Sequence, residues 1–540
     1  MHDLRVLVHL HQTPPAGIRR EARSLIAVGG LTSASPPDLP APRNLVRNQV
    51  QLITYVDRLA GDLAGLRTLL TGPLKGAFGG VHTLPFFDPI DGADAGFDPI
   101  DHREVDPRLG SWQDVEELGE VVPVMADLIV NHVSARSPQF QDVLARGDAS
   151  PHAPMFLTFD KVFPDGATET ALLTIYRPRP GLPLTPVQHA DRTRRLMWTT
   201  FTSDQIDVDV HATETCRYLD AILDRFAAHG ISMVRLDAVG YAVKTPGTSS
   251  FMTPETFAFI DGLAARAHER GIEVLVEVHA YWRKQVEIAA NVDWVYDFAL
   301  PPLVLHGLYT GSAARLRRWC AIRPRNAVTV LDTHDGIGVI DVGPGSSDVN
   351  GLGLLDADEL DELVEGIHEH SQGASRLATG AAASNVDLYQ VNCTFFDALG
   401  ADEHAYLMAR LIQLWLPGIP QIYYVGLLAG HNDLELLQRS GVGRDINRHR
   451  YTPDEVDKAL ARPVVQQLLA SLRLRNTHPA FDGDWELLDG EEHELAMRWT
   501  LDDEVAALHV DLATRTFQLS VTRDGELTTI ETSSELAGIA

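Results

Sequence analysis

Eight short apolar runs, separated by stretches of helical character, constrain the fold of this chain most strongly. Most of them are continuously apolar rather than alternating, which is typical of strands buried on both faces of a parallel sheet. Eight such strands with helical crossovers predict an α/β fold of the (β/α)8 TIM barrel type. The runs are VQLITYV (50–56), GGVHTLPF (79–86), VVPVMADLIV (121–130), ISMVRLD (231–237), IEVLVEVH (272–279), VDWVYDFAL (292–300), AVTVLDT (327–333) and IPQIYYV (419–425).

One crossover helix can be predicted with both of its ends. Thr253 is a suitable N-cap and Pro254 suits the first helical position, and apolar residues follow at helical spacing. Gly271 then ends the helix just before the fifth strand.

Two connections are too long for plain crossovers, and both leave the C-terminal ends of strands, so we expect them to overhang one mouth of the barrel. After about residue 480, HELAMRWTL, DEVAALHVDL and RTFQLSVTRDG predict short antiparallel strands. The predicted domains are a catalytic barrel (47–130, 212–336 and 401–480), an inserted B subdomain (131–211), an inserted B′ subdomain (337–400) and a C-terminal β-domain (481–540).

Residues 1–46 are rich in proline and small residues and contain few aromatics. Such a segment buries too little surface to offset its ordering entropy, so we expect a mostly disordered extension. An alternative is that translation starts later, near LVRNQVQLITY (45–55).

The charge and the cysteine content of the chain limit its binding partners and its cellular compartment. The net charge is −29, with 45 basic against 74 acidic residues, which argues against nucleic acid and anionic membranes. Cys216, Cys320 and Cys393 lie far apart and predict neither a disulfide framework nor a zinc site. The chain has no apolar run of about 18 residues and no clear signal peptide, so we expect a cytoplasmic protein.

Three acidic residues each follow an apolar run: Asp237, Glu277 and Asp335. Carboxylates at the C-terminal ends of different strands of one barrel converge on a single mouth. A pair of carboxylates with a third acid is what cleavage of a glycosidic bond needs.

With these residues in view, the chain resembles the α-amylase superfamily of retaining α-glycosidases. DLIVNH (127–132), RLDAVGY (235–241), EVHAY (277–281) and DTHD (332–335) resemble its four short conserved regions, in order. The resemblance narrows to the sucrose phosphorylase family and covers residues 47–540. It is carried by DGADAGFDPIDH (91–102), IYRPRPGLP (175–183), ATGAAASNVDLYQVN (378–392) and GRDINRH (443–449).

The resemblance implies a phosphorylase that converts sucrose and inorganic phosphate to glucose 1-phosphate and fructose, with other acceptors accessible by transglucosylation. Asp237 would be the nucleophile, Glu277 the general acid/base and Asp335 the transition-state stabiliser. Glu277 must hold a proton at neutral pH, whereas Arg235, on the same strand face as Asp237, should keep that aspartate ionised. No metal or organic cofactor is implied, and relatives occur as monomers or homodimers.

The resemblance also implies the substrate contacts. Glucosyl contacts would come from His132 and His334, from the Asp94–Arg444 pair and from the apolar walls Phe97 and Phe201. Arg179 would bind phosphate. The acceptor site would be completed by Tyr176, Gln205, Tyr241, His279, Asp387, Tyr389 and Gln390.

Two small departures, Ala280 and Val386, bear on acceptor preference, and Pro178 stands where phosphosucrose-cleaving members tend to carry a basic residue. The alternatives are a sucrose 6′-phosphate or glucosylglycerate phosphorylase, a retaining α-glucosidase or transglucosylase, and a non-catalytic sugar-binding barrel.

Overall fold

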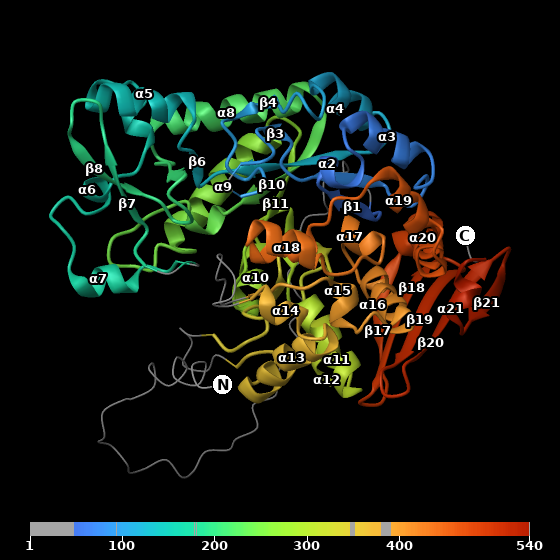
Figure 1. Ribbon diagram of the computed structural model, residues 1–540. Helices are drawn as coiled ribbons and strands as arrows, with labels where there is room; N and C mark the ends of the chain where they lie inside the picture. Colours follow the sequence, from blue (N-terminus) through green and yellow to red (C-terminus); the bar gives the residue numbers. More distant parts are fainter. Residues whose placement is uncertain are drawn as a thin grey trace, which may run out of the picture. The chain divides into compact units, whose positions relative to one another are not determined.

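The computed structural model describes residues 48–92, 94–177, 179, 181–345, 352–379 and 390–538. The predicted disorder of residues 1–46 lies outside the described residues. Eight parallel strands close into a barrel in the order β1-β16-β13-β12-β11-β10-β5-β2, which confirms the predicted fold (Figure 1). The strands are β1 (Gln51–Thr54), β2 (Gly80–Thr83), β5 (Val124–Ile129), β10 (Ile231–Asp237), β11 (Glu273–Val276), β12 (Trp294–Asp297), β13 (Ala327–Thr329) and β16 (Ile419–Tyr423).

The barrel strands are buried on both faces, as their continuous apolar runs predict. A separate cluster of buried side chains from six strands and their ends fills the interior, so the polar chemistry is left to the strand ends. Its members are Met125, Met233, Leu275, Trp294, Tyr296, Phe298, Val328, Val330 and Ile419. Gly418 directly precedes β16 with a φ of +110°, and a Cβ there would lie 2.0 Å from the Ala327 carbonyl oxygen.

Helices cover the outside of the barrel. The predicted helix is α9, which begins at Pro254, and Thr253 accepts a hydrogen bond from the Thr256 N–H. It ends at His268, slightly before the predicted stop at Gly271. Among the described helices, none is both long and apolar enough to cross a membrane. The barrel helices are α2 (Val56–Leu59), α3 (Leu63–Thr71), α4 (Trp112–Gly119), α8 (Thr213–Ala228), α9 (Pro254–His268), α10 (Trp282–Ala289), α11 (Leu300–Thr310), α12 (Ala314–Ile322), α16 (Glu403–Trp415), α17 (Tyr424–Leu427), α18 (Leu434–Ser440), α19 (Pro453–Leu460) and α20 (Pro463–Thr477).

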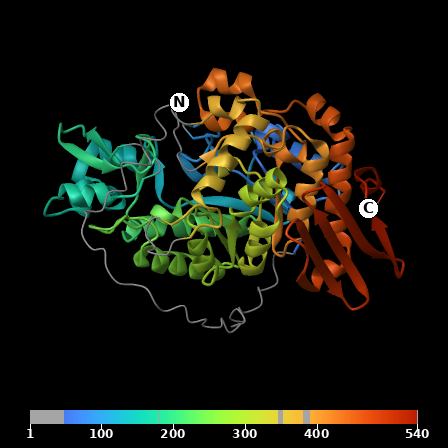
Figure 2. The same ribbon diagram turned by 90° about the horizontal axis from the view of Figure 1, so that it is seen from below.

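The long connection after β5 forms small antiparallel pairs, β6 with β9 and β7 with β8, and Figure 2 shows these strands and their short helices in teal. Its elements are β6 (His132–Ser134), α5 (Pro138–Arg146), α6 (Phe159–Val162), α7 (Glu169–Thr174), β7 (Leu184–Gln188), β8 (Arg194–Trp198) and β9 (Gln205–Asp207). The connection after β13 contains β14 (Ile337–Gly338), α13 (Ala357–His370), α14 (Ala374–Leu377), β15 (Gln390–Val391) and α15 (Phe395–Ala398). The exact boundaries of both inserted subdomains stay predictions.

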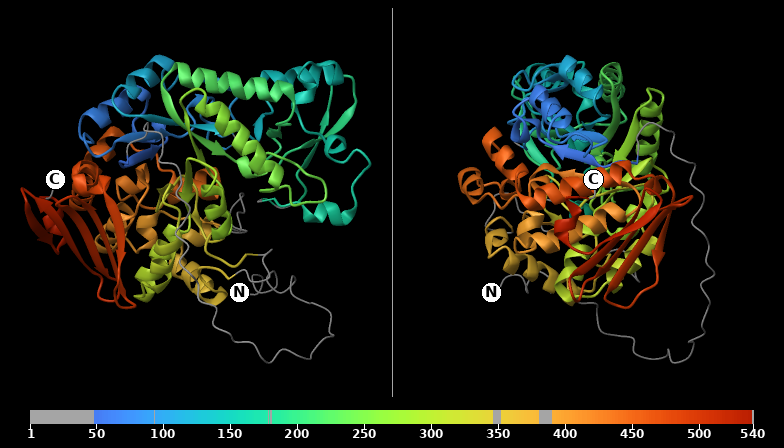
Figure 3. Two further views of the ribbon diagram at one scale, coloured as in Figure 1. Left: turned by 180° about the vertical axis from the view of Figure 1, so that it is seen from behind. Right: turned by 90° about the vertical axis from the view of Figure 1, so that its right-hand side faces the viewer.

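The C-terminal segment forms the expected antiparallel sheet, with five strands in sequence order (Figure 3). Its inner face packs against the barrel helix α16: the Trp415 indole N–H donates to the Ala506 carbonyl, and Trp499 donates to the Trp415 carbonyl at 2.7 Å. The strands are β17 (Asp484–Leu488), β18 (Glu494–Leu501), β19 (Glu504–Asp511), β20 (Thr516–Arg523) and β21 (Glu526–Ile530), followed by α21 (Ser533–Leu536). Short pieces elsewhere are β3 (Phe87–Asp88), β4 (Asp101–Val105), η3 (Val239–Tyr241), η5 (Gly443–Asn447) and η6 (Pro479–Asp482).

Candidate active site

A pocket opens at the C-terminal ends of the barrel strands. Asp237 is the last residue of β10, Glu277 directly follows β11, and Asp335 lies in the segment after β13. The structure therefore brings all three predicted acids to one pocket. Most of the predicted binding residues line it too: Asp94, Phe97, His132, Tyr176, Arg179, Phe201, Gln205, Tyr241, His279, His334, Gln390 and Arg444. Asp387 and Tyr389 lie outside the described residues.

Arg235 lies beneath the pocket floor and joins two aspartates. Its Nη1 is 2.5 Å from Asp127 Oδ1 and 2.9 Å from Asp237 Oδ1, and its side chain is almost fully buried. Asp127 in turn lies 3.1 Å from the Nε2 of His82. Burial alone would raise the pKa of Asp127, but Arg235 and His82 lower it to about 2. Asp127 and His82 were not predicted as site residues, although Asp127 opens the DLIVNH motif.

The carboxyl groups of Asp237 and Glu277 lie close enough for their charges to interact. Burial raises the pKa of Asp237 well above its ordinary value; Arg235 opposes the rise and Glu277 adds to it. The expectation that Arg235 keeps Asp237 ionised stays a prediction: the guanidinium favours the anion, whereas burial and the second carboxylate oppose it. Arg235 lies 2.9 Å from Asp237 but 3.9 Å from Glu277, so its positive charge favours the anionic form of Asp237 more than that of Glu277.

Asp335, unlike Asp237, is surrounded mainly by positively charged groups. The Nη1 of Arg444 forms an ion pair with its Oδ1 at 2.7 Å, and Arg448 Nη2 lies 3.8 Å from the same oxygen. Burial would raise the pKa of this carboxyl, but Arg444, His334 and Arg448 hold it far below its ordinary value. Asp335 is thus a fixed anion. The sequence paired Arg444 with Asp94, which lines the same pocket, and did not predict the contact of Arg444 with Asp335.

Histidines and aromatic rings form the walls of the pocket. His132 Nε2 lies 3.0 Å from the Phe97 carbonyl oxygen, and the Phe97 ring stacks on His334 at 4.9 Å. Burial lowers the pKa of both histidines, so neutral rings are available to bind sugar hydroxyls. Phe201 packs against His132 at 5.5 Å and against Tyr241 at 5.2 Å.

The wall around Tyr241 contains one aromatic ring that the sequence did not reveal. The Phe251 ring packs against both Tyr176 and Tyr241, with a centroid distance of 4.7 Å to each. Phe251 lies in the long segment between β10 and α9, and it belongs to none of the motifs that the sequence offered.

Lys244 joins three segments that surround the pocket. Its Nζ lies 2.6 Å from both Asn131 Oδ1 and Asp207 Oδ2, and it also donates to the Tyr241 carbonyl. Its side chain is buried. This ammonium therefore ties the end of β5 and the strand β9 to the segment that follows Asp237.

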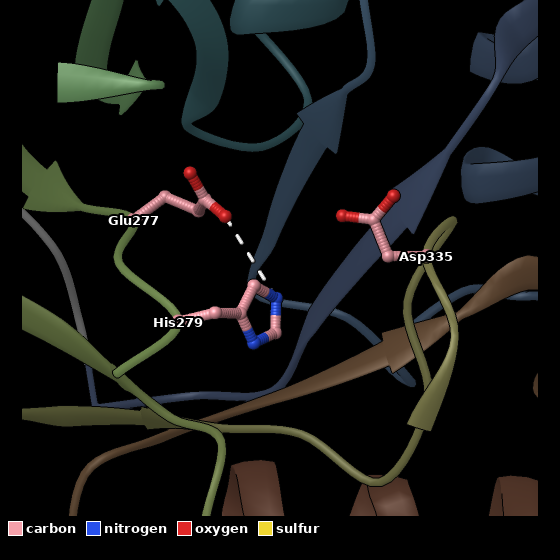
Figure 4. Close-up of side chains that lie close together, drawn as sticks. All are labelled: Glu277, His279 and Asp335. Carbon is pink, nitrogen blue, oxygen red and sulfur yellow. Dashed lines mark ion pairs between the residues drawn. The ribbon is translucent and has the colours of Figure 1, made fainter. Parts of the chain in front are cut away.

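Figure 4 shows Glu277, His279 and Asp335 facing one another across the pocket. Their nearest polar atoms all lie within 4.8 Å, and His279 Nε2 is 3.8 Å from Glu277 Oε1. Burial opposes protonation of His279, but Asp341 and Glu277 raise its pKa to about 9. The carboxylates around the ring favour its cationic form, which suits proton transfer and anion binding.

Comparisons with known proteins give the family of the chain. Residues 44–294 match the family model of the α-amylase catalytic domain. A sucrose phosphorylase from Agrobacterium vitis is 59% identical over 469 residues, which cover 87% of this chain and 96% of that protein. A sucrose phosphorylase from Bifidobacterium adolescentis is 53% identical, covering 86% of this chain and 92% of that protein.

A solved structure extends the match to three dimensions. The crystal structure of sucrose 6F-phosphate phosphorylase from Thermoanaerobacter thermosaccharolyticum superposes with a TM-score of 0.83 at 37% identity. The alignment covers 90% of this chain and 98% of that one. The chain belongs to the sucrose phosphorylase family of the α-amylase superfamily.

Proposed function

We propose that this protein catalyses phosphorolysis of sucrose with retention of configuration, which yields α-D-glucose 1-phosphate and D-fructose. The observation that carries the proposal is the meeting of Asp237, Glu277 and Asp335 in one pocket of a barrel whose relatives at 59% and 53% identity are sucrose phosphorylases. The enzyme is then a glucosyltransferase of the disaccharide phosphorylase type.

In the first half-reaction, Asp237 attacks the anomeric carbon of the glucosyl ring while the bond to the fructosyl oxygen breaks. Glu277 gives its proton to that oxygen, and a β-glucosyl ester forms on Asp237. The position of Arg235, 2.9 Å from Asp237 and 3.9 Å from Glu277, suits this division of roles, because the nucleophile must be an anion and the other carboxyl an acid. Asp335, held ionised by Arg444, can bind ring hydroxyls more strongly as positive charge develops on the sugar.

In the second half-reaction, a phosphate oxygen attacks the same carbon from the side that fructose has left. The ester bond to Asp237 breaks, and Glu277 takes a proton from the entering phosphate where one is present. The glucosyl unit would be held by Asp94, His132, His334, Arg444, Phe97 and Phe201. The acceptor would be held by Tyr176, Arg179, Gln205, Tyr241, His279 and Gln390, together with Asp387 and Tyr389.

Phosphate must compete with water for the ester. Water outnumbers phosphate in a cell by roughly 10³–10⁴, so preferential positioning has to supply about 4–5 kcal/mol. Arg179 and His279 line the pocket and offer positive charge to a phosphate anion. These steps use no metal or organic cofactor.

We place the enzyme in the cytoplasm. Its three free cysteines are compatible with that compartment.

The test is product analysis with the purified protein, sucrose and either phosphate or no phosphate. We expect glucose 1-phosphate and fructose in equal amounts only when phosphate is present. Release of glucose at a rate indifferent to phosphate would instead assign the protein to the retaining α-glucosidases. Faster turnover of sucrose 6′-phosphate or glucosylglycerate than of sucrose would change the proposed substrate, whereas phosphorolysis would remain the proposed reaction.

A further inference from the structure

One buried carboxylate beside the pocket has no part in the mechanism above. Asp341 follows β14, and its side chain is fully buried. Its Oδ1 accepts hydrogen bonds from the Ala280 backbone N–H at 3.1 Å and from Gln285 Nε2 at 2.8 Å. These two donors fix the carboxylate, so its Oδ2 faces His279 Nδ1 at 3.1 Å.

The neighbouring strand leaves room for this contact. A Cβ on Gly338 would lie 2.3 Å from Asp341 Oδ2 and 3.3 Å from His279 Nδ1. Any larger residue at this position would push the carboxylate away from the ring. The packing therefore requires glycine at position 338 for the Asp341–His279 contact to exist.

The opposite edge of the His279 ring faces the substrate pocket. The ring stacks on Phe298 with a centroid distance of 3.8 Å, which fixes its plane. Its Nε2 lies 3.1 Å from Gln390 Nε2 and 3.8 Å from Glu277 Oε1. Gln390 is held by the pairing of β14 with β15, in which it lies opposite Gly338.

These contacts favour opposite protonation states of His279. The Gly336 N–H donates to Gln390 Oε1 at 3.1 Å, so the Gln390 amide nitrogen faces His279, which suits a neutral ring with a lone pair on Nε2. The charged groups around the ring, Asp341, Glu277 and Asp335, all favour the cation and raise its pKa to about 9. In the cationic form, the Nε2–H of His279 faces another donor, the Gln390 amide nitrogen. An anionic oxygen bound beside Glu277 would accept a hydrogen bond from this Nε2–H.

We propose that Asp341 is a positioning residue for the acceptor phosphate, because it orients His279 and stabilises its imidazolium form so that Nε2–H is offered to a phosphate oxygen. This inference rests on the proposed function and extends it to the choice between phosphate and water. Asp341 itself is not among the residues that line the pocket. It acts through His279 alone.

The test is the ratio of glucose to glucose 1-phosphate formed from sucrose at a fixed phosphate concentration. The Asp341→Asn variant keeps the size of the side chain but removes its charge, so His279 loses the partner of its cationic form. We expect this ratio and the KM for phosphate to rise about tenfold, the change expected when a charge-assisted hydrogen bond becomes neutral. The rate of fructose release without phosphate should change much less.

A pH profile separates this role from a merely structural one. In the parent enzyme the KM for phosphate should rise as the pH passes about 9, where His279 loses its proton. In Asp341→Asn the same rise should occur at a clearly lower pH. In a His279→Gln background the Asp341→Asn change should no longer affect the product ratio, because the two residues act as one unit.

The matched control is Asp293→Asn. Asp293 also contacts a histidine, His268, at 2.6 Å, but it lies before β12 and so at the other end of the barrel strands. This control should leave the product ratio unchanged. If Asp341→Asn does not fold, Gly338→Ala displaces the same carboxylate and should raise the ratio instead.

Two results would overturn the inference. One is a product ratio in Asp341→Asn within about twofold of the parent enzyme, since a lost charge-assisted bond predicts more. The other is an effect of Asp341→Asn that persists in full without His279. A parent enzyme that releases glucose regardless of phosphate would refute the proposed function itself, and that outcome is read before any variant is compared.

Discussion

The buried contact between Asp127 and Arg235 beneath the pocket allows a quantitative prediction for Asp127→Asn. Both side chains are almost fully excluded from solvent, so their interaction is weakly screened. The pKa of Asp127 falls from its ordinary 3.8 to about 2. At 1.36 kcal/mol per pKa unit, this corresponds to about 2.5 kcal/mol of unfolding free energy at neutral pH. The variant also leaves Arg235 with one fewer anionic partner, so the loss should be at least this large.

The pH dependence follows from the sign of the change. The folded pKa lies below the unfolded one, so the stabilisation is complete above pH 3.8 and is lost as the pH falls toward 2. Urea unfolding of the parent and of Asp127→Asn should differ by about 2.5 kcal/mol at pH 7, and the gap should shrink below about pH 4. Asp148→Asn removes an exposed partner of Arg195 and should have little effect. A difference of less than about 0.5 kcal/mol at pH 7 would refute the reasoning.

Three further substitutions test the site. Asp237→Asn should abolish glucose 1-phosphate formation while the melting temperature stays close to that of the parent; appreciable residual turnover would mean that another residue is the nucleophile. Arg444→Met should lower kcat/KM for sucrose by about 10²–10³, because Asp335 loses its 2.7 Å ion pair and its alignment with the sugar; steady-state kinetics with an unchanged rate would contradict this. Lys244→Met should lower the free energy of unfolding in urea by about 3–5 kcal/mol, because Asp207 is left buried with one partner fewer. A calorimetric melting temperature equal to that of the parent would show that Lys244 does not stabilise the contact between these segments.

The fold was predictable because each barrel strand is a continuous apolar run, and burial on both faces demands such a run. The three acids were predictable because each follows a strand and therefore reaches the same mouth. The N-terminal end of α9 was equally clear, since Thr253 and Pro254 carry a local signal that needs no tertiary information.

The contacts that tune the acids were not predictable in this way. Asp341 meets His279 only because β14 and β15 pair across a long insertion, and nothing in the sequence near Asp341 indicates a partner. Arg444 reaches Asp335, and Lys244 reaches Asp207, through similar long-range packing. The raised pKa of Asp237 has the same origin, because burial and the position of Glu277 appear only in the folded chain.

The central claim, that Asp237 becomes glucosylated during turnover, is tested most directly by trapping the intermediate. In Glu277→Gln, α-D-glucosyl fluoride can still react, because fluoride leaves without a proton, whereas release of the sugar to an acceptor is slowed. Mass spectrometry of the digested protein should then find one glucosyl unit on the peptide that contains Asp237. A glucosyl unit on a different residue, or fluoride release with no adduct on the protein, would contradict the account.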